Sequence, residues 1–449
     1  MSDNRTTTSP TFADVNRDVL RTLDPPGNLY FAWMCFVALL LAGFFVAWTG
    51  QVWWGMGMAG KRVPQMWAMY ITTFVFWIGI GHAGTLISAI LYLFRARWRT
   101  SIYRGAEAMT IFAVDDGRPV PADPRRAHVV RVLPPAVSEP ALPVAELPVA
   151  LWSGTCSRSR PTSSVSTVFF IVGLVPDIAA LRDASTGWRR RIFSMLALGW
   201  EGSDTQWRHY RRAYGLLASL ATPLVLSVHS VVSWDFAMAL VPGWHSTLFA
   251  PFLRRRRHLL GFAMVLILML PMRHFFHLHA YIQEKHLDAM GQADPGHGLV
   301  LTYFYICEVF TSLYSGEHIE KASLFWKVTA TYAWALWTMY FCNCVAPLIL
   351  FWKRCPHEPG HLYIVSILVL IGMWFERFNI IVPSLGHDFY PYTWGIYYPS
   401  PTDTMIVIGS FSFFFLLFLG FIKLMPSLSI VGGEGDDPRR RSGSRAHGH

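Results

Sequence analysis

Residues 29–48 read LYFAWMCFVALLLAGFFVAW, an apolar run without a single charged side chain. A helix needs ~20 consecutive apolar residues to cross the core of a bilayer, and this run has that length. Similar stretches recur at 65–94, 214–236, 258–271, 299–314, 325–351, 361–382 and 402–424. Because repeated runs of this length are the strongest fold signal that a sequence carries, they predict an all-α polytopic membrane protein.

The composition agrees with a membrane protein. Hydrophobic residues make up 53% of the 449 residues and charged residues only 15%, against about 25% charged in soluble domains. The net charge of +10 does not point to nucleic acid, because the charges sit in short loops, as the positive-inside rule expects. The partner that this pattern predicts is therefore the lipid bilayer.

Six cysteines occur without a CxxC pair. Cys342 and Cys344 lie inside an apolar run, so we interpret them as packing thiols rather than metal ligands. The first 27 residues are polar and lack the apolar core of a cleavable signal peptide. No metal site is predicted.

Arginines crowd into alternate connections between the apolar runs. The richer connections hold Arg95, Arg97, Arg99, Arg104, Arg182, Arg189, Arg190, Arg191, Arg208, Arg211, Arg212, Arg273, Lys285, Lys353 and Arg354. The connections 237–250 and 384–401 hold neither Lys nor Arg, and the first has only Lys61 and Arg62. Numbered from the N-terminus, the arginine-rich connections are the even-numbered loops. This asymmetry predicts that both termini and these loops are cytoplasmic.

With about ten transmembrane helices, the fold expected is two four-helix bundles plus two flanking helices. Residues 1–27 would be a cytoplasmic N-terminal segment, 28–425 the transmembrane domain and 426–449 a cytoplasmic C-terminal tail. The aromatic, proline-rich outer loops, such as 390–399, would suit a docked extrinsic partner.

Three stretches, 115–163, 253–260 and 291–297, do not fit this pattern. The clearest is Leu253-Arg-Arg-Arg-Arg-His-Leu-Leu, which would bring four arginines into a span at several kcal/mol each. Its codons, read one base later, can encode Phe-Val-Ala-Gly-Ala-Ile-Phe. We interpret all three stretches as segments translated in a shifted reading frame; the alternative is a genuine insertion. A mature peptide containing Pro161-Thr-Ser-Ser-Val would contradict the frame shift.

Restoring the frame in the first stretch changes two candidate positions. It places a histidine where Pro124 stands and an aspartate where Gly154 stands. Both restored groups would fall on the outer side of the membrane, where they join the outer-end candidates among the intact residues.

Ionisable residues inside spans are costly and are functional candidates by default. His229 and Asp235 fall at the outer end of one predicted helix, and Glu376 and Arg377 in the outer half of another. A carboxylate beside a neutral imidazole has the basicity to accept protons from a quinol. The structural alternatives are a buried Glu376–Arg377 ion pair, a satisfied core histidine at 229, and an N-cap role for Asp235.

His82 and Glu107 lie in neighbouring predicted helices, nearer the inner side. They are candidates for the start of a proton path, or for a structural pair. The sequence shows no histidine pair spaced for haem and no cysteine set for an iron–sulfur cluster. Any electrons would therefore have to leave to another subunit.

The intact segments resemble the NrfD/polysulfide-reductase membrane-subunit family, and within it the ActC-type subunits of alternative complex III. The motifs that carry the resemblance are Asp24-Pro-Pro-Gly-Asn-Leu-Tyr-Phe-Ala-Trp, Gly81-His-Ala-Gly-Thr-Leu, Arg99-Thr-Ser-Ile-Tyr-Arg-Gly-Ala-Glu, Ala197-Leu-Gly-Trp, Leu226-Ser-Val-His-Ser-Val-Val-Ser-Trp-Asp-Phe-Ala, Pro242-Gly-Trp-His and Gly372-Met-Trp-Phe-Glu-Arg-Phe. They cover nearly the whole chain apart from the shifted stretches and the last ~18 residues.

The resemblance implies a quinol-binding subunit, not catalytic alone, of a menaquinol-oxidising respiratory or photosynthetic complex in the bacterial inner membrane. It implies an extrinsic iron–sulfur protein on the outer side, multi-haem cytochrome subunits and a paralogous NrfD-like subunit as partners. The alternatives are a polysulfide- or nitrite-reductase-type anchor, a scaffold without quinone, an ActF-like proton-translocating paralogue, and a transporter or proton channel. A transporter would place its charges at the midplane.

Overall fold

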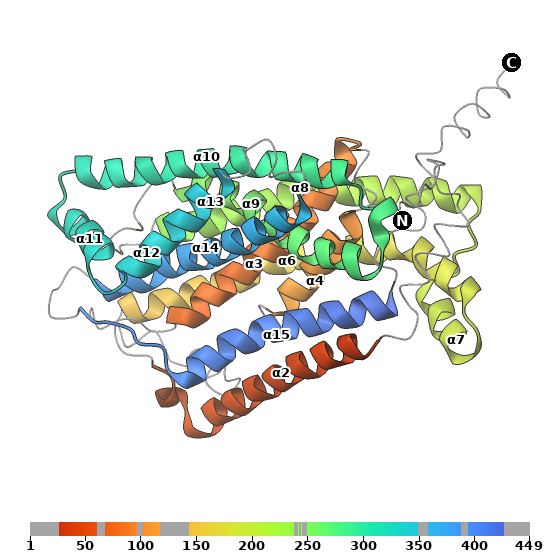
Figure 1. Ribbon diagram of the computed structural model, residues 1–449, viewed down its shortest axis with the longest axis horizontal. Helices are drawn as coiled ribbons and strands as arrows, with labels where there is room; N and C mark the ends of the chain where they lie inside the picture. The colour runs from red at the N-terminus through yellow and green to blue at the C-terminus, as the bar shows by residue number, and fades with distance from the viewer. Residues whose placement is uncertain are drawn as a thin grey trace, which may run out of the picture.

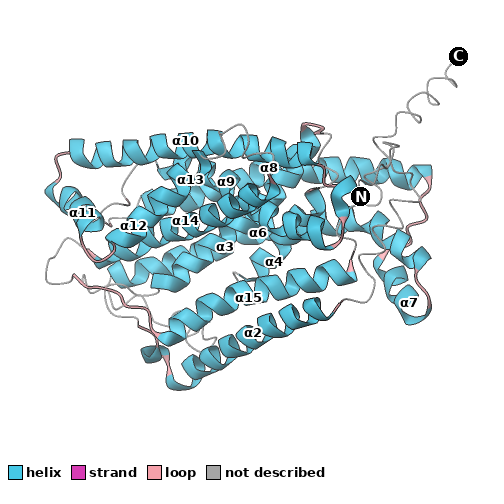
Figure 2. Ribbon diagram, viewed as in Figure 1, coloured by secondary structure: helices cyan, strands magenta, loops and turns pink. Residues whose placement is uncertain are grey.

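The structure is a computed structural model that describes residues 27–60, 68–96, 102–116, 143–237, 241, 244, 249–348, 358–387 and 394–425. For 143–161, Asp235, 249–258 and a few further positions it describes the backbone only. Every regular element in the described residues is helical (Figure 2). The helices are α2 Asn28–Trp54, η1 Met56–Met58, α3 Ala68–Leu93, α4 Tyr103–Asp116, α6 Pro143–Ala184, α7 Gly187–Leu196, α8 Asp204–Ala237, α9 Phe249–Phe275, η3 Leu278–Ala280, α10 Glu284–Tyr314, α11 His318–Thr329, α12 Ala333–Tyr340, the π-helix η4 Phe341–Val345, α13 Ala346–Leu348, α14 Pro359–Gly386 and α15 Pro401–Leu424.

Six stretches of these described helices are long and apolar enough to cross a membrane. They are α2, α3, residues 162–184 of α6, residues 204–234 of α8, α14 and α15. Shorter apolar stretches at 259–275 of α9 and 298–314 of α10 add to them. The all-helical, multi-pass character predicted from the apolar runs is therefore confirmed, whereas the count of ten spans stays a prediction.

The long helices lie side by side along the longest axis of the molecule (Figure 1). The first turn of α2 meets the last turns of α15, because Tyr30 Oη donates to the Leu419 carbonyl at 2.8 Å and Lys423 Nζ lies 5.7 Å from the Tyr30 ring centroid. These two helix ends lie toward the side of the molecule that holds α7. We call this side the arginine-rich end, and the side with 394–400 the opposite end.

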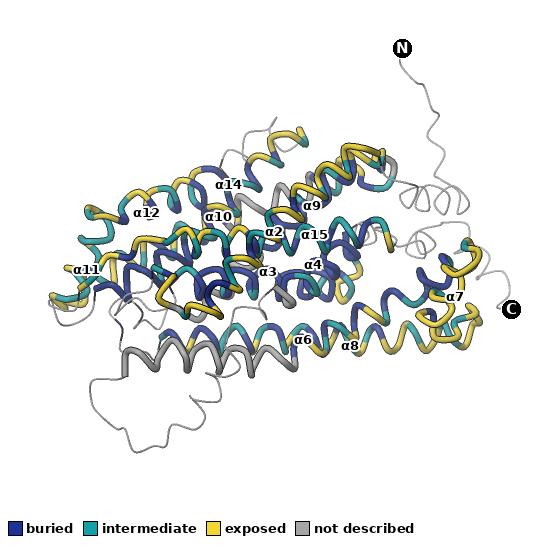
Figure 3. The backbone as a smooth tube through the Cα atoms, turned by 90° about the horizontal axis from the view of Figure 1, so that it is seen from below, coloured by how far each residue is buried: buried dark blue, intermediate teal, exposed yellow. Residues whose placement is uncertain are grey.

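The packing follows from which faces are apolar. α2 and α15 pair with each other, and α15 also contacts α3 and α4. α3, α4, α6 and α8 pack together, as do α9, α10, α12, η4 and α14, and α3 joins the two groups through α9 and α14. Figure 3 shows α3 and α4 mostly buried, whereas α7 is largely exposed. α3 is therefore the central helix, and polar side chains on it are isolated from solvent.

The predicted single span 325–351 is wrong, because the described part of it, up to Leu348, is broken. α11 ends at Thr329, where Ala330 takes an extended conformation (φ −93°, ψ −158°), and α12 begins at Ala333. The following residues 341–345 form a π-helix. Single π-helical turns inside α-helices are frequent at functional sites, and here the widened turn brings the buried Asn343 against α14.

Arg104 does not belong to a loop, as its place among the loop arginines predicted. It lies in α4 and is 1% exposed, because two carboxylates compensate its charge inside the protein. The backbone is helical at 253–260 and 291–297. The orientations of the arginine side chains 254–257 lie outside the description, so the frame-shift interpretation stays a hypothesis.

Candidate functional site

α3 carries polar side chains at three-residue intervals. His82, Thr85 and Ser88 follow Gly79, and because each step turns by about 60°, successive members are neighbours in a row that winds around the helix. All three polar side chains are buried. Buried polar groups need partners, so each of these positions marks a place where a neighbouring helix supplies one.

His82 meets His229 of α8 in the middle of the molecule. The two ring centroids lie 4.9 Å apart with the planes at 70°, and His82 is 1% exposed. His229 Nδ1 lies 3.1 Å from the Val225 carbonyl oxygen. Because a carbonyl oxygen can only accept, this contact needs the proton on Nδ1. It orients the ring so that Nε2 is the nitrogen on the far side from Val225.

His229 lies in the last third of α8, which begins at Asp204 rather than near 214 and ends at Ala237. Its ring contacts His82, near the middle of α3. The placement of His229 at the outer side of the membrane stays a prediction. The contact with His82 was not predicted, because it joins helices far apart in the chain.

Glu376 and Arg377 of α14 form a buried ion pair. Arg377 Nη1 lies 3.0 Å from Glu376 Oε2, and their side chains are 6% and 1% exposed. Arg377 Nη1 also donates to the Met373 carbonyl at 2.6 Å. The pair was one of the two readings that the sequence left open, and the structure shows it formed.

Two further helices complete this polar group. Tyr305 Oη of α10 donates to Glu376 Oε1 at 2.7 Å, and Asn343 Nδ2 of the π-helix donates to Tyr305 Oη at 3.1 Å. Gly372 lets the asparagine approach, since a Cβ there would lie 2.3 Å from Asn343 Oδ1. Tyr305 and Asn343 were not predicted, although an asparagine inside an apolar run is a signal that could have found the second.

Gly79 connects the two polar groups. An added Cβ at Gly79 would lie 3.5 Å from Arg377 Nη2, so the guanidinium reaches the surface of α3. His82 lies one turn further along the same face. The ion pair on α14 and the histidine pair between α3 and α8 are therefore neighbouring groups near the centre of the molecule.

A second ionic cluster lies closer to the arginine-rich end. Arg104 Nη1 lies 3.2 Å from Glu107 Oε2, its Nη2 pairs with Asp177 of α6, and Nη2 also donates to the Gly173 carbonyl at 2.8 Å. Arg104, Glu107 and Asp177 are nearly inaccessible to solvent. The spacing Arg104-Gly-Ala-Glu107 places both members of the first pair on one helix face, so this pair could have been predicted from the sequence.

Glu107 is tied to α3 and α8 as well. Ser88 Oγ donates to Glu107 Oε1 at 2.7 Å, and Tyr214 Oη donates to the same oxygen. A turn away, Thr85 Oγ1 donates to Ser166 Oγ at 2.8 Å and lies 3.2 Å from Thr110 Oγ1. Glu107 therefore has Arg104, Ser88 and Tyr214 as partners. The predicted alternative of a structural pair between His82 and Glu107 stays a prediction.

The opposite end holds a buried carboxylate that the sequence reading missed. Asp403 Oδ2 accepts from the Gly60 amide at 2.9 Å and from Tyr397 Oη at 2.9 Å, and Asp403 with Ser400 forms a capping box on α15. Burial, reinforced by the Asp403 carboxylate, raises the pKa of Tyr397, so this phenol stays a donor. The local function of Asp403 is to fix the start of α15 against two loops.

Three predicted positions cannot be compared in the same detail. Asp235 lies in the last turn of α8, next to Phe236, whose ring packs 4.8 Å from that of Trp244, but its side chain lies outside the description. Gly154 lies in α6 where only the backbone is described, and Pro124 lies outside the described residues. Of the residues predicted at the outer-end quinol site, the structure describes the side chains of His229, Glu376 and Arg377.

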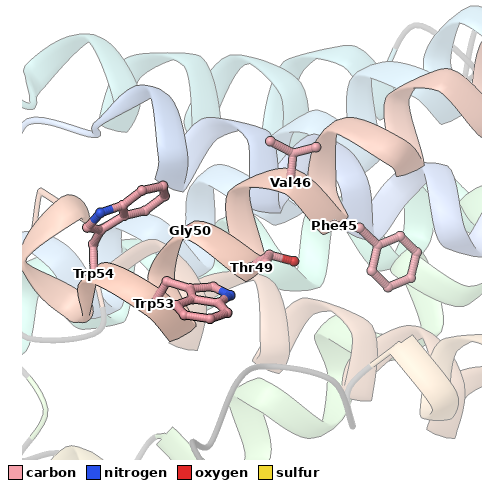
Figure 4. A pocket seen from close by; sticks show the side chains of 6 residues that line it. All are labelled: Phe45, Val46, Thr49, Gly50, Trp53 and Trp54. Atoms are coloured by element: carbon pink, nitrogen blue, oxygen red, sulfur yellow. The ribbon is translucent and has the colours of Figure 1, made fainter.

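A shallow apolar hollow lies on the side of α2, far from these polar groups in the fold. Phe45, Val46, Thr49, Gly50, Trp53 and Trp54 line it (Figure 4). Trp53 and Trp54 are exposed near the end of the helix, where aromatic residues of membrane proteins gather at the boundary with water. Such a surface fits a lipid chain and has no group suited to proton chemistry.

Among the side chains that the structure describes, no three His, Cys, Asp or Glu residues come together as a metal ion would require. The donor groups near the centre are imidazoles, a phenol, an amide and one ion pair. Such groups bind and exchange protons with hydroxyl-bearing ligands. Comparison with known proteins finds neither a family model nor a curated relative that matches this chain.

Proposed function

We propose that this chain is the quinol-binding membrane subunit of an NrfD-type complex, most like the ActC subunit of alternative complex III. The observation that carries the proposal is the buried contact between His82 of α3 and His229 of α8, near the Glu376–Arg377 pair. Ionisable groups inside membrane helices cost several kcal/mol unless a function or a partner retains them. The motif resemblance supplies the choice of quinol as the ligand.

The donor set fits a ligand with two hydroxyl groups. A bound quinol supplies two electrons and two protons when it is oxidised. His229 Nε2, with Nδ1–H held by the Val225 carbonyl, is the group able to take a proton. Arg377 and Glu376 compensate each other's charge and position the surrounding helices, so His229 with His82 are the proposed proton-accepting groups and the ion pair is their support.

Asp235 carries the proposed proton route onward. It lies six residues beyond His229 on α8, toward the opposite end of the molecule. Electrons would leave to an extrinsic iron–sulfur protein on that side and then to multi-haem cytochrome subunits, with a paralogous membrane subunit alongside. The chain is then a subunit of a quinol:acceptor oxidoreductase rather than an enzyme by itself.

We further propose ten spans, in two four-helix bundles with α2 and α15 as the flanking pair, in the bacterial inner membrane. The start of α2, the end of α15 and the arginines around α7 share one side of the molecule (Figure 1). The positive-inside rule assigns that side to the cytoplasm, so both termini are placed there.

Replacement of Asp235 tests the proton route. Asp235→Asn keeps the size of the side chain and removes its basicity, so we expect menaquinol oxidation by the assembled complex to fall by about 10²-fold. Assembly, measured by co-purification of the subunits, should be unchanged. The matched control is Asp183→Asn, at an exposed carboxylate of the arginine-rich end. Wild-type turnover in Asp235→Asn would reduce this residue to a helix cap.

A second candidate function, proton translocation, rests on the buried polar side chains of α3. Thr85 donates to Ser166, and Ser88 donates to Glu107, between His82 and the arginine-rich end. Buried hydroxyl groups beside a carboxylate favour a proton path toward that side. The proton path and the quinol site would share only the His82–His229 pair, so one chain can serve both functions.

A further inference from the structure

The short helix α7 exposes an apolar face that its own protein does not cover. Trp188 is 68% and Met195 78% exposed, and Ile192 and Leu196 are exposed beside them. At 100° per residue, these four side chains fall within a sector of about 100°. An apolar sector of this width is normally buried against something, and in a soluble setting it would be a liability.

Arginines border this sector on both sides. Arg189 and Arg191 project at roughly 80° to either side of the centre of the apolar sector at helical spacing. The Arg189 guanidinium carbon lies 5.8 Å from the centroid of the Trp188 ring. The order arginine, apolar sector, arginine around one helix is the pattern of a helix that lies flat in a bilayer surface.

The depth of α7 is fixed by its other face. α7 packs against α6, and Phe193 and Ala197 belong to one hydrophobic cluster with Ile178 and Ala179 near the end of α6. Because residues 162–184 of α6 form a candidate membrane span, this packing holds α7 at the level where that span leaves the bilayer. Gly187 (φ 67°) and Gly199 (φ 72°) take left-handed conformations on either side, so the chain can turn sharply into and out of α7.

We propose that α7 is an in-plane helix that inserts its apolar sector among the lipids of one leaflet and binds anionic headgroups through Arg189 and Arg191. Charge complementarity favours this partner over a protein, since arginines flank both edges and more follow at Arg208, Arg211 and Arg212 in the first turns of α8. Juxtamembrane arginines attract phosphate headgroups of anionic lipids. This inference is independent of the proposed quinol site.

Spin labels test the insertion in the full chain. In a background without the native cysteines, Met195→Cys and Ser194→Cys are labelled and reconstituted into nanodiscs of phosphatidylcholine with phosphatidylglycerol. Both side chains are exposed, but Ser194 projects away from the apolar sector, so it is the matched control. We expect the Met195 label to collide mainly with oxygen dissolved in lipid, and the Ser194 label mainly with an aqueous nickel chelate.

The role of the arginines is tested with the same label. Replacing Arg189 and Arg191 by Gln should lower the inserted fraction on anionic lipid, by about fivefold for each arginine, and leave it unchanged on phosphatidylcholine alone. A Met195 label that is as water-exposed as the Ser194 label would overturn the insertion and leave the face to a protein partner. Equal insertion in the two lipids, with or without the arginines, would overturn the headgroup contact.

Discussion

The two buried ionic groups of this protein differ in their balance of charge. Glu376 and Arg377 form a closed pair of one acid and one base, completed by neutral donors from Tyr305 and Asn343. The cluster at the arginine-rich end sets one arginine, Arg104, against two carboxylates, Glu107 and Asp177. The first group is neutral when both members are ionised, whereas the second carries an excess negative charge.

This difference indicates different tasks. A pair of one acid and one base is suited to holding α14 against α10. The cluster with two carboxylates depends on Arg104, and its Glu107 also joins the hydroxyl of Ser88 on α3. We therefore expect removal of Arg104 or of Glu376 to lower stability, and removal of Glu107 to act mainly through proton uptake.

The largest effect on stability is expected for Arg104. Arg104→Met would remove the arginine with which two buried carboxylates pair, at a cost of about 3–5 kcal/mol. Thermal unfolding in detergent and the yield of folded protein measure this loss. Arg95→Met, at an exposed arginine just after α3, is the control and should unfold like the wild type. Equal unfolding of both variants would mean that the cluster is not buried.

A somewhat smaller effect is expected for the closed pair. Glu376→Gln strands the Arg377 charge and should cost about 3 kcal/mol, while the amide can still accept from Tyr305. Adding Arg377→Met to Glu376→Gln removes the stranded charge and should restore most of the loss, as a double-mutant cycle would record. A double variant that is less stable than Glu376→Gln would show that Arg377 has another essential partner.

Glu107→Gln tests most sharply whether the Arg104 cluster serves proton uptake or stability. It removes the excess carboxylate and leaves Arg104 paired with Asp177, so we expect a change of only about 1 kcal/mol or less in stability. If the polar side chains of α3 conduct protons, vesicles containing this variant complex should lose proton uptake from the arginine-rich side while quinol oxidation continues. A loss as large as that of Glu376→Gln would make Glu107 a structural partner instead.

The smallest effect is expected for His387, outside the spans at the opposite end. Its ring stacks on Trp394 at 3.8 Å, and burial lowers its pKa from 6.5. The folded state therefore binds the proton less readily than the unfolded chain, so stability is lost as the pH falls below about 6.5 toward the lowered pKa. His387→Phe keeps an aromatic ring and should flatten this part of the stability–pH curve; an unchanged curve would contradict the assignment.

The sequence predicted the class of fold well, because apolar runs such as 29–48 and 402–424 report directly on membrane helices. It left a buried Glu376–Arg377 pair open as the structural alternative to a role in quinol binding, and the pair is formed. These features depend on local composition alone. The break between Thr329 and Ala333 was not predicted, because no proline or glycine marks it.

The rest of the candidate site depends on contacts between distant helices. His82 meets His229, and Arg104 meets Asp177, from segments whose relative rotation no apolar pattern specifies. Arg104 was assigned to a loop because its charge resembled that of the neighbouring arginines. Its buried position follows only once α4 and α6 are packed together, since the compensating Asp177 comes from the second helix.

The most direct test of the central proposal is to locate a bound quinone. A photoreactive azido-menaquinone analogue, added to the assembled complex, illuminated and followed by peptide mass spectrometry, would identify the residues it contacts. We expect labelled peptides from α3 around His82 and from α8 around His229, with labelling reduced by unmodified menaquinone. Labelling confined to the hollow around Trp53, or to α4 around Glu107, would contradict a quinol site at the histidine pair.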